Sequence, residues 1–239
     1  NSKYPIYTDL HTHSISSGHG SEDTITDMIR CASESGLSLF GISDHGPATS
    51  SSAKPSYFQS LKLADRDRFG IRVLYGAELN IINTAGDVDL DDEILSALDY
   101  AIISIHPPIF KPYHDKDLSS AYIRAMDHPK VRFLGHIDDA RFPVDFEYLL
   151  EIAKEKHVYP EINNGSLMPD AYRINGQENC RRILSICKKL DLPVLLSSDS
   201  HGKKNIGNMQ YIFPLLEELD FPAHLVLNSD LSVLSEIIR

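Results

Sequence analysis

Asp9-Leu10-His11-Thr12-His13 follows a short apolar segment, residues 5–7, that we expect to be the first strand of the fold. Alternate residues of an extended segment point to the same side, so His11 and His13 share one face. Two imidazoles on one face of a strand end form half of a site for a divalent metal ion. With 11 His in 239 residues such a pair also arises by chance, so it needs support from the rest of the chain.

The composition is that of an ordinary globular protein, with 42% hydrophobic and 24% charged residues, and we expect a single domain over residues 1–239. The formal net charge of −11 argues against a nucleic-acid partner, because phosphate polymers select clustered Lys and Arg. Bound divalent cations would reverse this charge locally and so admit a small anionic substrate.

The 3 Cys are an odd and low number, which indicates a reducing compartment rather than a disulfide framework. The sequence contains neither a signal peptide nor an apolar stretch long enough to span a membrane. We therefore expect a cytoplasmic protein without a membrane partner.

Apolar strand segments alternate with helical segments along the chain, which is the pattern of parallel βα units. Thr24 and Asp145 are expected N-caps of two of the helices, and helical stretches at about 208–219 and 229–238 finish the chain. The apolar run 100–105 is typical of a strand that is covered on both faces. Seven such strands predict an α/β fold.

An open, doubly wound sheet satisfies the same alternation, but its Gly-rich phosphate-binding fingerprint is missing. Residues that commonly bind metals follow nearly every predicted strand. A closed barrel explains them better, because its C-terminal rim gathers all strand ends at one mouth.

The candidate metal ligands at or just beyond the strand ends are His11, His13, His19, His45, Glu78, His106, His136, Asp199 and His201. This mixture of imidazoles and carboxylates suits zinc, manganese or iron rather than magnesium or calcium. Shared through one carboxylate, nine side chains fit three metal ions. We expect three divalent transition metals, with zinc first and manganese or iron as alternatives.

A single His after a strand is more often a hydrogen-bonded structural residue than a ligand. Glu78 is harder to explain in this way, because it lies between Ala77 and Leu79 with no Lys or Arg adjacent. A buried carboxylate needs a positive partner. The recurrence of His at successive strand ends therefore favours a metal site.

Six short motifs occur in a fixed order along nearly the whole chain. They are Asp9-Leu10-His11-Thr12-His13, Ser43-Asp44-His45, Gly76-Ala77-Glu78, Ser104-Ile105-His106, Gly135-His136 and Ser198-Asp199-Ser200-His201. This series resembles that of the PHP (polymerase and histidinol phosphatase) family. The resemblance implies a distorted (β/α)₇ TIM-like barrel, a metal-dependent hydrolase, with a trinuclear metal site at its C-terminal rim.

Two further segments, Glu161-Ile162-Asn163-Asn164-Gly165-Ser166 and Glu178-Asn179-Cys180-Arg181, resemble the YcdX-type phosphatase branch of that family. One departure is His136-Ile137-Asp138, where the branch usually has His-Pro-Gly. The ligand is kept there, but the adjacent loop and hence the substrate are expected to differ.

The resemblance also implies which metal each residue binds. His11, His13 and Asp199 would hold the first ion, and Glu78 would bridge it to a second ion. His106 and His136 would hold the second ion. The third ion would be held by His19, His45 and His201.

The function so implied is the hydrolysis of a small phosphomonoester by a hydroxide that bridges the first two ions. Glu78 and Asp199 would be catalytic by fixing the ion separation and aiming that hydroxide. His114 and Arg141 follow strands on the same rim, and each is either a phosphate contact or a solvated loop residue.

Other functions remain open at this point. A histidinol phosphatase or a protein-tyrosine phosphatase would belong to the same family. Metal-dependent deaminases and amidohydrolases also use His-x-His barrels, but they add a Lys at a strand end, and no Lys stands there in this chain. A non-enzymatic accessory domain would be expected to lack some of the ligands.

Overall fold

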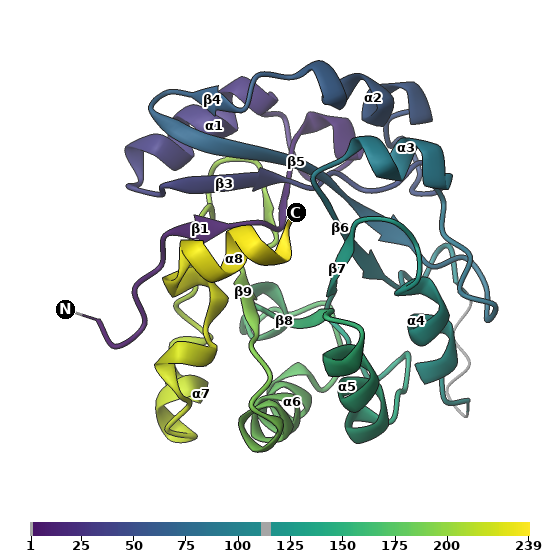
Figure 1. The fold of residues 1–239 in the computed structure, drawn as a ribbon, viewed down its shortest axis with the longest axis vertical. Coiled ribbons are helices and arrows are strands. Elements are labelled where there is room, and N and C mark those ends of the chain that lie inside the picture. Colours follow the sequence, from purple (N-terminus) through teal and green to yellow (C-terminus); the bar gives the residue numbers. More distant parts are fainter. Residues whose placement is uncertain (1, 111–115) are drawn as a thin grey trace.

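The computed structural model describes residues 2–110 and 116–239, and a curved sheet of parallel strands forms its centre (Figure 1). The strands run in the order β1 (Thr8–Asp9), β3 (Leu39–Ile42), β5 (Ile71–Asn80), β6 (Tyr100–Ser104), β7 (Val131–Leu134), β8 (Tyr159–Asn163) and β9 (Leu195–Ser197). Each pairs in parallel with its neighbour, while the short β4 (Asp67–Arg68) pairs antiparallel with β5. This arrangement confirms the predicted distorted, seven-stranded TIM-like barrel.

The barrel is closed between β9 and β1 by the segment 225–228 rather than by direct strand pairing. Val194 N–H donates to the carbonyl of Leu225 over 2.8 Å, and Tyr7 N–H donates to the carbonyl of Asn228 over 3.0 Å. The buried amide of Asn228 accepts from Leu196 N–H at 2.8 Å and donates to the carbonyls of Thr8 at 3.0 Å and Leu196 at 2.8 Å. One side chain therefore joins the two edges of the sheet.

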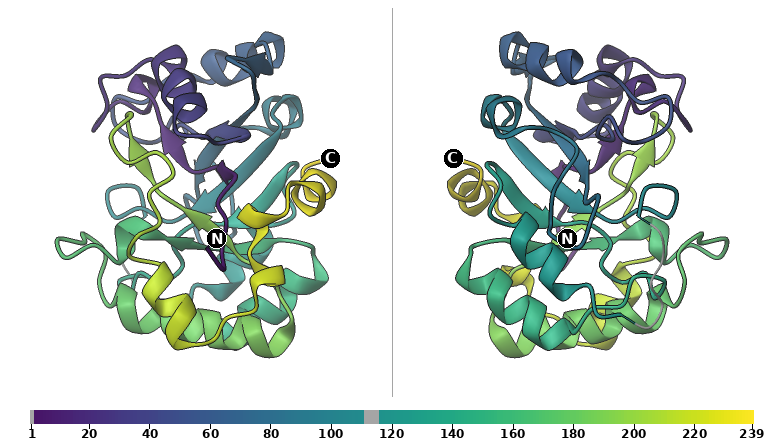
Figure 2. Two further views of the ribbon diagram at one scale, coloured as in Figure 1. Left: turned by 90° about the vertical axis from the view of Figure 1, so that its left-hand side faces the viewer. Right: turned by 90° about the vertical axis from the view of Figure 1, so that its right-hand side faces the viewer.

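Helices lie on the outside of the strands (Figure 2). They are α1 (Ile25–Glu34), α2 (Pro55–Ser60), α3 (Asp92–Ala97), α4 (Ser119–Ala125), α5 (Phe146–Glu155), α6 (Gly176–Leu190) and α7 (Phe213–Glu218). Thr24 and Asp145 accept hydrogen bonds from the first turns of α1 and α5, which confirms both predicted N-caps. The apolar faces of the helices join the main hydrophobic core.

The last helix, α8 (Leu231–Ile237), covers the end of the barrel where the strands begin. Leu234 is buried in a second core together with residues from inside the barrel, including Leu39 and Tyr100. Arg132 Nε donates to the carbonyl of Ile237 over 2.8 Å and so holds the end of this helix. The opposite end of the barrel stays open to a ligand.

Two expected elements differ in the structure, and one short strand was not expected. The first strand is Thr8–Asp9 rather than residues 5–7, because the backbone N–H of Tyr7 bonds to the closing segment at Asn228. Thr12–His13 forms a strand of its own, β2, which pairs with β10 (Ser200–His201) in a small parallel sheet. Of the helical stretch at 208–219, only Phe213–Glu218 is α-helical.

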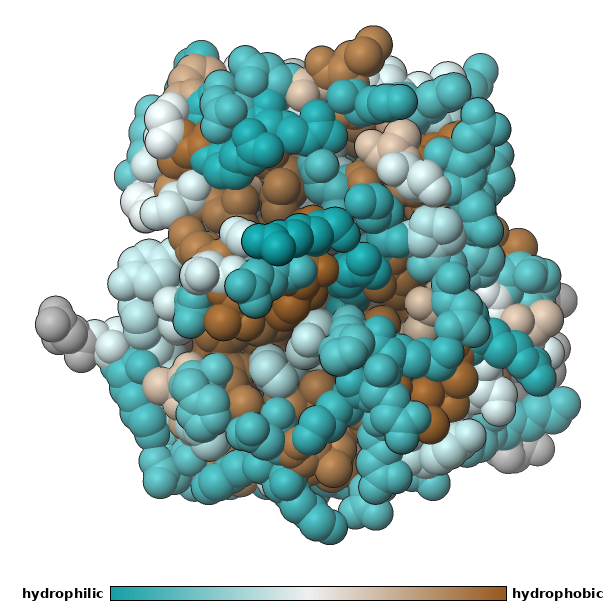
Figure 3. All heavy atoms as spheres, viewed as in Figure 1, coloured by the Kyte–Doolittle hydropathy of each residue, from teal (hydrophilic) through white to brown (hydrophobic). Residues whose placement is uncertain are grey.

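On the face shown in Figure 3, hydrophobic residues lie mostly in recesses between hydrophilic ones. Among the described residues no helix combines the length and the apolar character that crossing a bilayer requires.

Candidate metal centre

The strand ends bring the predicted ligands together from distant parts of the chain. His13 lies in β2, next to His201 in β10, since the two residues are partners in the small rim sheet. His45 forms an isolated bridge with Glu78 at the end of β5. His106 and His136 are each the second residue after the end of β6 and β7. The C-terminal rim is therefore the place where these side chains meet.

One group of donor atoms lies deepest. Nε2 of His11 and Nε2 of His13 lie 3.3 and 3.4 Å from Oε2 of Glu78. Oδ1 of Asp199 lies 3.4 Å from the same atom of His11 and 3.1 Å from that of His13. His11, His13 and Glu78 are all buried, so this pocket of ligand atoms is shielded from water.

Glu78 also faces imidazoles on its other side. Its Oε1 lies 3.0 Å from Nε2 of His136 and 3.3 Å from Nε2 of His106. Its Oε2 lies 2.8 Å from Nδ1 of His45. A single carboxylate is thus positioned between the deep group and the outer imidazoles, as a bridging ligand must be.

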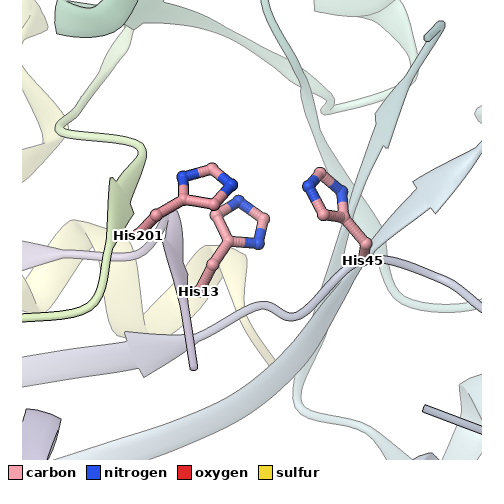
Figure 4. Close-up of side chains that lie close together, drawn as sticks. All are labelled: His13, His45 and His201. Atoms are coloured by element: carbon pink, nitrogen blue, oxygen red, sulfur yellow. The ribbon is translucent and has the colours of Figure 1, made fainter. Parts of the chain in front are cut away.

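Towards the mouth of the barrel, His13 of the deep group meets the outer imidazoles of His19, His45 and His201. The ring of His13 lies 4.2 Å from that of His45 and 4.3 Å from that of His201, between centroids (Figure 4). His19, on an exposed turn, stacks on His45 at 4.9 Å, and its ring centre lies 5.2 Å from that of His201. The three residues that the resemblance assigns to a third ion are therefore neighbours.

Three sets of donor atoms lie within 4.8 Å of one another and have the composition of metal sites. These sets are His11, His13 and Glu78; His45, Glu78 and His106; and His13, His45 and His201. The grouping differs in part from that implied by the resemblance, because His45 lies near Glu78 and His106 as well as near His201. His13, His45 and Glu78 each belong to two sets.

Several of the buried donor atoms make no hydrogen bond within the described residues. They are Nε2 of His11, Nε2 of His13, Nδ1 of His45 and Oε2 of Glu78. A buried polar atom without a partner is costly, and such atoms rarely occur in a group without a reason. Imidazole nitrogens and carboxylate oxygens that converge in this way fit divalent transition metals.

The second nitrogen of most of these imidazoles is held by a protein partner. Nδ1 of His13 lies 2.9 Å from Oγ of Ser17, and Nδ1 of His106 lies 2.7 Å from Oδ1 of Asn80. Nδ1 of His11 is hydrogen-bonded to the buried carboxylate of Glu161. Such outer bonds fix the tautomer and direct Nε2 into the centre.

Two acidic residues outside the predicted ligand set support the centre. Both lie within motifs quoted from the sequence, Glu161 in residues 161–166 and Asp44 in Ser43-Asp44-His45, but neither was predicted as a supporting residue. Asp44 accepts from Ser14 N–H at 2.7 Å, from Ser17 Oγ at 2.8 Å and from the Tyr57 hydroxyl at 2.6 Å. It thereby fixes the turn that directly follows His13.

Arg173 is the supporting residue that the sequence did not indicate. Its Nη2 lies 2.6 Å from Oδ2 of Asp199, and its Nη1 donates to Oγ of Ser166 over 3.1 Å. Burial lowers the pKa of this guanidinium, but Asp199 and Asp138 raise it above its usual range. Its only sequence signal was a basic residue in a polar loop.

The carboxylate-rich side of the centre attracts positive charge. Burial alone lowers the pKa of His11, but Glu161, Asp199 and Glu78 raise it well above the ordinary range of a histidine. Burial favours the neutral acid of Glu78, yet His11 and the outer imidazoles hold its pKa well below the usual range. A metal ion would supply the positive charge that these carboxylates require.

On the imidazole-rich side of the centre, protonation of the histidines is disfavoured. Burial and the neighbouring imidazoles of His45 and His201 hold the pKa of His13 well below its usual value. The pKa of His19 is lowered by the same two causes. Neutral imidazole is the form that binds metals, so this side is ready for ligation near neutral pH.

The backbone at two of the predicted ligands is strained. His136 has a φ of 27° and Asp199 a φ of 55°, in the left-handed region that non-glycine residues seldom adopt. Strain of this kind concentrates at functional sites, where the surrounding structure holds it in place.

Of the two predicted substrate contacts, the structure describes only Arg141. His114 lies outside the described residues. Arg141 forms a two-pronged pair with Asp139, with Nη2 at 2.6 Å from Oδ2 and Nε at 3.0 Å from Oδ1. Its guanidinium also lies 4.3 Å from the ring centre of Tyr172.

Comparison with known proteins gives consistent results. A family model described as PHP domain matches residues 9–165. A protein of Clostridium acetobutylicum named "Probable phosphatase" is 37% identical over 237 residues, which are 99% of this chain and 95% of that protein. A protein of Acetivibrio thermocellus with the same name is 34% identical over 231 residues, 97% of this chain and 94% of the other.

Among solved structures, the histidinol phosphate phosphatase of Lactococcus lactis, in complex with zinc, L-histidinol and phosphate, has a TM-score of 0.60. It is 18% identical, and the match covers 90% of this chain and 94% of that one. This likeness concerns the fold.

Proposed function

Because the chain belongs to the PHP domain family, we propose that it is a metal-dependent phosphatase that hydrolyses a small phosphomonoester. The observation that carries the proposal is the set of buried, unpartnered imidazole and carboxylate atoms around Glu78. Relatives that share over a third of the sequence across nearly the whole chain bear the name phosphatase, which supports the same activity.

We propose that the centre binds three divalent transition metals, with zinc the preferred ion. Imidazole and carboxylate donors in these proportions suit zinc, with manganese and iron as alternatives. The residues that would hold the ions are His11, His13, His19, His45, Glu78, His106, His136, Asp199 and His201. When bound, the ions supply positive charge at the phosphate and lower the pKa of water at the site.

The side chains around the ions have distinct tasks. Glu78 fixes the spacing of the imidazoles around it, since each of its oxygens faces a different set. Oε2 faces His11, His13 and His45, and Oε1 faces His106 and His136. Glu161 holds His11 in the tautomer that presents Nε2 to the centre. Asp199 presents one oxygen to His11 and His13 while Arg173 binds the other.

Thiol chemistry does not fit this site. Burial raises the pKa of the Cys180 thiol well above its ordinary value, and burial raises that of Cys187 as well. A neutral, buried thiol is a poor nucleophile. Hydrolysis that depends on the metal-binding residues, without a covalent cysteine step, is therefore the mechanism that we propose.

The test is phosphate release from benzyl phosphate after metal removal and after addition of Zn²⁺ or Mn²⁺. We expect the stripped protein to be inactive and reconstitution to restore turnover. His11→Ala and Asp199→Ala should lower kcat by more than the roughly 100-fold that loss of an outer partner costs. The matched control is His224→Ala, an exposed histidine that contacts Asp191 on the surface.

Unchanged turnover in His11→Ala would contradict the proposed site. Release of ammonia from amides or amino-substituted heterocycles, without release of phosphate from esters, would instead identify a deaminase or amidohydrolase.

A further inference from the structure

A pocket of about 490 Å³ opens directly beside the outer imidazoles of the candidate metal centre. His19, His45 and His106 form part of its lining. The volume lies in the range of small-molecule sites and far exceeds the needs of a phosphate group. A phosphate held at the centre would therefore place the rest of its ester in this pocket.

The rest of the lining has two chemical parts. Thr49, Ser50 and Ser51 supply hydroxyl groups. Pro107, Pro108, Ile109 and Tyr172 supply apolar and aromatic surface. Among the described residues that line the pocket there is no Asp, Glu, Lys or Arg. The described part of the lining thus offers hydrogen bonds and apolar contact, but no acidic or basic side chain to pair with an ammonium or a carboxylate.

The hydroxyl-bearing wall is fixed in place by its contacts with the metal centre. Thr49 Oγ1 accepts from Nδ2 of Asn80 over 3.0 Å, and Asn80 in turn lies 2.7 Å from Nδ1 of His106. A Cβ added to Gly18 would lie 2.2 Å from the carbonyl carbon of Ser51, so the two loops pack closely. The shape of this wall is therefore set before a substrate binds.

Tyr172 belongs to the apolar part of the lining although its side chain is largely exposed. The ring is held by the guanidinium of Arg141, 4.3 Å from its centre. Arg141 is held in turn by the two oxygens of Asp139. Since Asp139 neutralises this cation, Arg141 is suited to positioning the ring rather than to binding an anion.

We propose that this pocket selects phosphomonoesters of uncharged alcohols with an apolar or aromatic body, and that Tyr172 forms its apolar wall. The inference rests on the proposed phosphatase activity. A charged group brought into the pocket would lose water without gaining an opposite charge. An uncharged ring would bury apolar surface against Ile109, Pro108 and Tyr172.

The test compares three esters of equal reactivity and nearly equal size: benzyl phosphate, 4-(aminomethyl)benzyl phosphate and 4-carboxybenzyl phosphate. With the zinc-loaded protein we expect kcat/KM for the neutral ester to exceed that for each charged ester by at least about tenfold. Equal values for the three esters would overturn the inference and leave the phosphatase proposal standing. If neither these three esters nor methyl phosphate releases phosphate, the phosphatase proposal itself is rejected.

A charge placed in the pocket should change this preference. Ile109→Asp is expected to raise the ratio of kcat/KM for the aminomethyl ester to that for benzyl phosphate by at least about tenfold. The matched control is Leu63→Asp, which adds the same charge at a residue 88% exposed and outside the lining. An unchanged ratio in a folded Ile109→Asp protein would contradict the assignment of this pocket.

Two further variants test the wall itself and are independent of whether Ile109→Asp folds. Tyr172→Ala, at an exposed position, should raise KM for benzyl phosphate by about tenfold, with kcat nearly unchanged. KM for methyl phosphate, which has no ring to place, should not move. Arg141→Met should produce a smaller shift in the same direction. Equal losses of kcat for both esters would indicate a structural defect and overturn the assigned role.

Discussion

Asp199 divides its two oxygens between two environments. Oδ1 faces the imidazoles of His11 and His13, and Oδ2 accepts from Arg173 at 2.6 Å. Burial favours the neutral acid, but His11 and Arg173 hold the pKa of Asp199 well below the usual range. The carboxylate is therefore charged and held in one orientation, as a metal ligand requires.

Arg173→Met should weaken both the fold and the centre. Removing one partner of a buried ion pair leaves Asp199 without its counter-charge, at a cost of about 3–5 kcal/mol in the free energy of unfolding. We also expect fewer metal equivalents per chain by elemental analysis. Arg181→Met is the control, because that arginine pairs with Glu178 and Glu218 on the surface. Full metal content and unchanged stability in Arg173→Met would contradict this role.

Glu161→Gln tests the outer support of His11 without changing side-chain size. The amide cannot supply the negative charge that holds the Nδ1 proton, so we expect metal affinity to fall about 10–100-fold in competition with a chelator. Glu151→Gln, on the exposed side of α5, should leave the affinity unchanged. Equal affinities for the two variants would show that Glu161 does not support the centre.

At the scale of elements, α4 and α5 are joined at their first turns by a short chain of hydrogen bonds. Asp145 N–H donates to Ser119 Oγ over 2.8 Å, and Ser119 N–H donates to Asp117 over 2.8 Å. Burial favours the neutral form of Asp117, but the hydrogen bonds from Ser119 together lower its pKa below the ordinary value of 3.8.

Because its folded-state pKa is depressed, Asp117 stabilises the protein above the unfolded pKa and loses this contribution as pH falls through the folded value. Asp117→Ala should lower the free energy of unfolding by about 1 kcal/mol at pH 7. The difference from the unsubstituted protein should shrink below about pH 4 in urea titrations. Asp170→Ala, at an exposed turn, should show no such dependence. A difference that stays constant down to pH 2 would refute the assignment.

Asn228→Ala should weaken the closure of the barrel between β9 and β1. It leaves the carbonyls of Thr8 and Leu196 and the N–H of Leu196 without the side chain that binds them, at about 1–3 kcal/mol for each buried group. We expect a total loss of about 3–5 kcal/mol in chemical denaturation. Asn83→Ala removes as many bonds from an exposed turn and should cost far less. Equal losses of unfolding free energy in the two variants would show that closure of the barrel does not depend on the Asn228 amide.

The sequence predicted the parts of the fold that repeat. The strand ends could be read because apolar runs stop at polar residues, and the N-caps Thr24 and Asp145 have local signatures. Asn228 could not be found in this way, because it replaces a strand pairing with three bonds to residues about 30 and 220 positions away. A loop that closes the barrel produces no repeating pattern of apolar and polar residues by which the sequence could reveal it.

In the candidate site, too, some residues could be predicted from the sequence and others could not. His11, His13 and Glu78 were predictable because each follows or ends an apolar strand, and parallel strands end at one rim. Arg173 was not, because its partner Asp199 lies 26 residues further on and nothing near it repeats. The sharing of His45 between two groups of donors depends on side-chain directions that spacing alone does not give.

At the scale of the whole molecule, bound cations would reconcile the formal net charge of −11 with the proposed anionic substrate. The deep carboxylates Glu78, Asp199 and Glu161 add negative charge where a phosphate would approach. Divalent ions at the same place would reverse the local sign. Metal binding at this centre would therefore affect both the stability of the protein and its proposed activity.

Removing the metals should lower the melting temperature as well as abolish turnover. A ligand at 100 times its dissociation constant stabilises the native state by about 2.7 kcal/mol, so the loss of several ions is readily measured by calorimetry. Adding Zn²⁺ back should restore the melting temperature, whereas Arg173→Met should recover less than the unsubstituted protein. A chelator that leaves the melting temperature unchanged would argue against metals at this buried centre.

The most direct test of the central claim is the metal content of the purified chain, measured by inductively coupled plasma mass spectrometry alongside phosphate release. We expect about three equivalents of divalent transition metal per chain after reconstitution, with turnover rising as the ions are restored. Less than one equivalent, with no gain in phosphate release after metal is added, would contradict it.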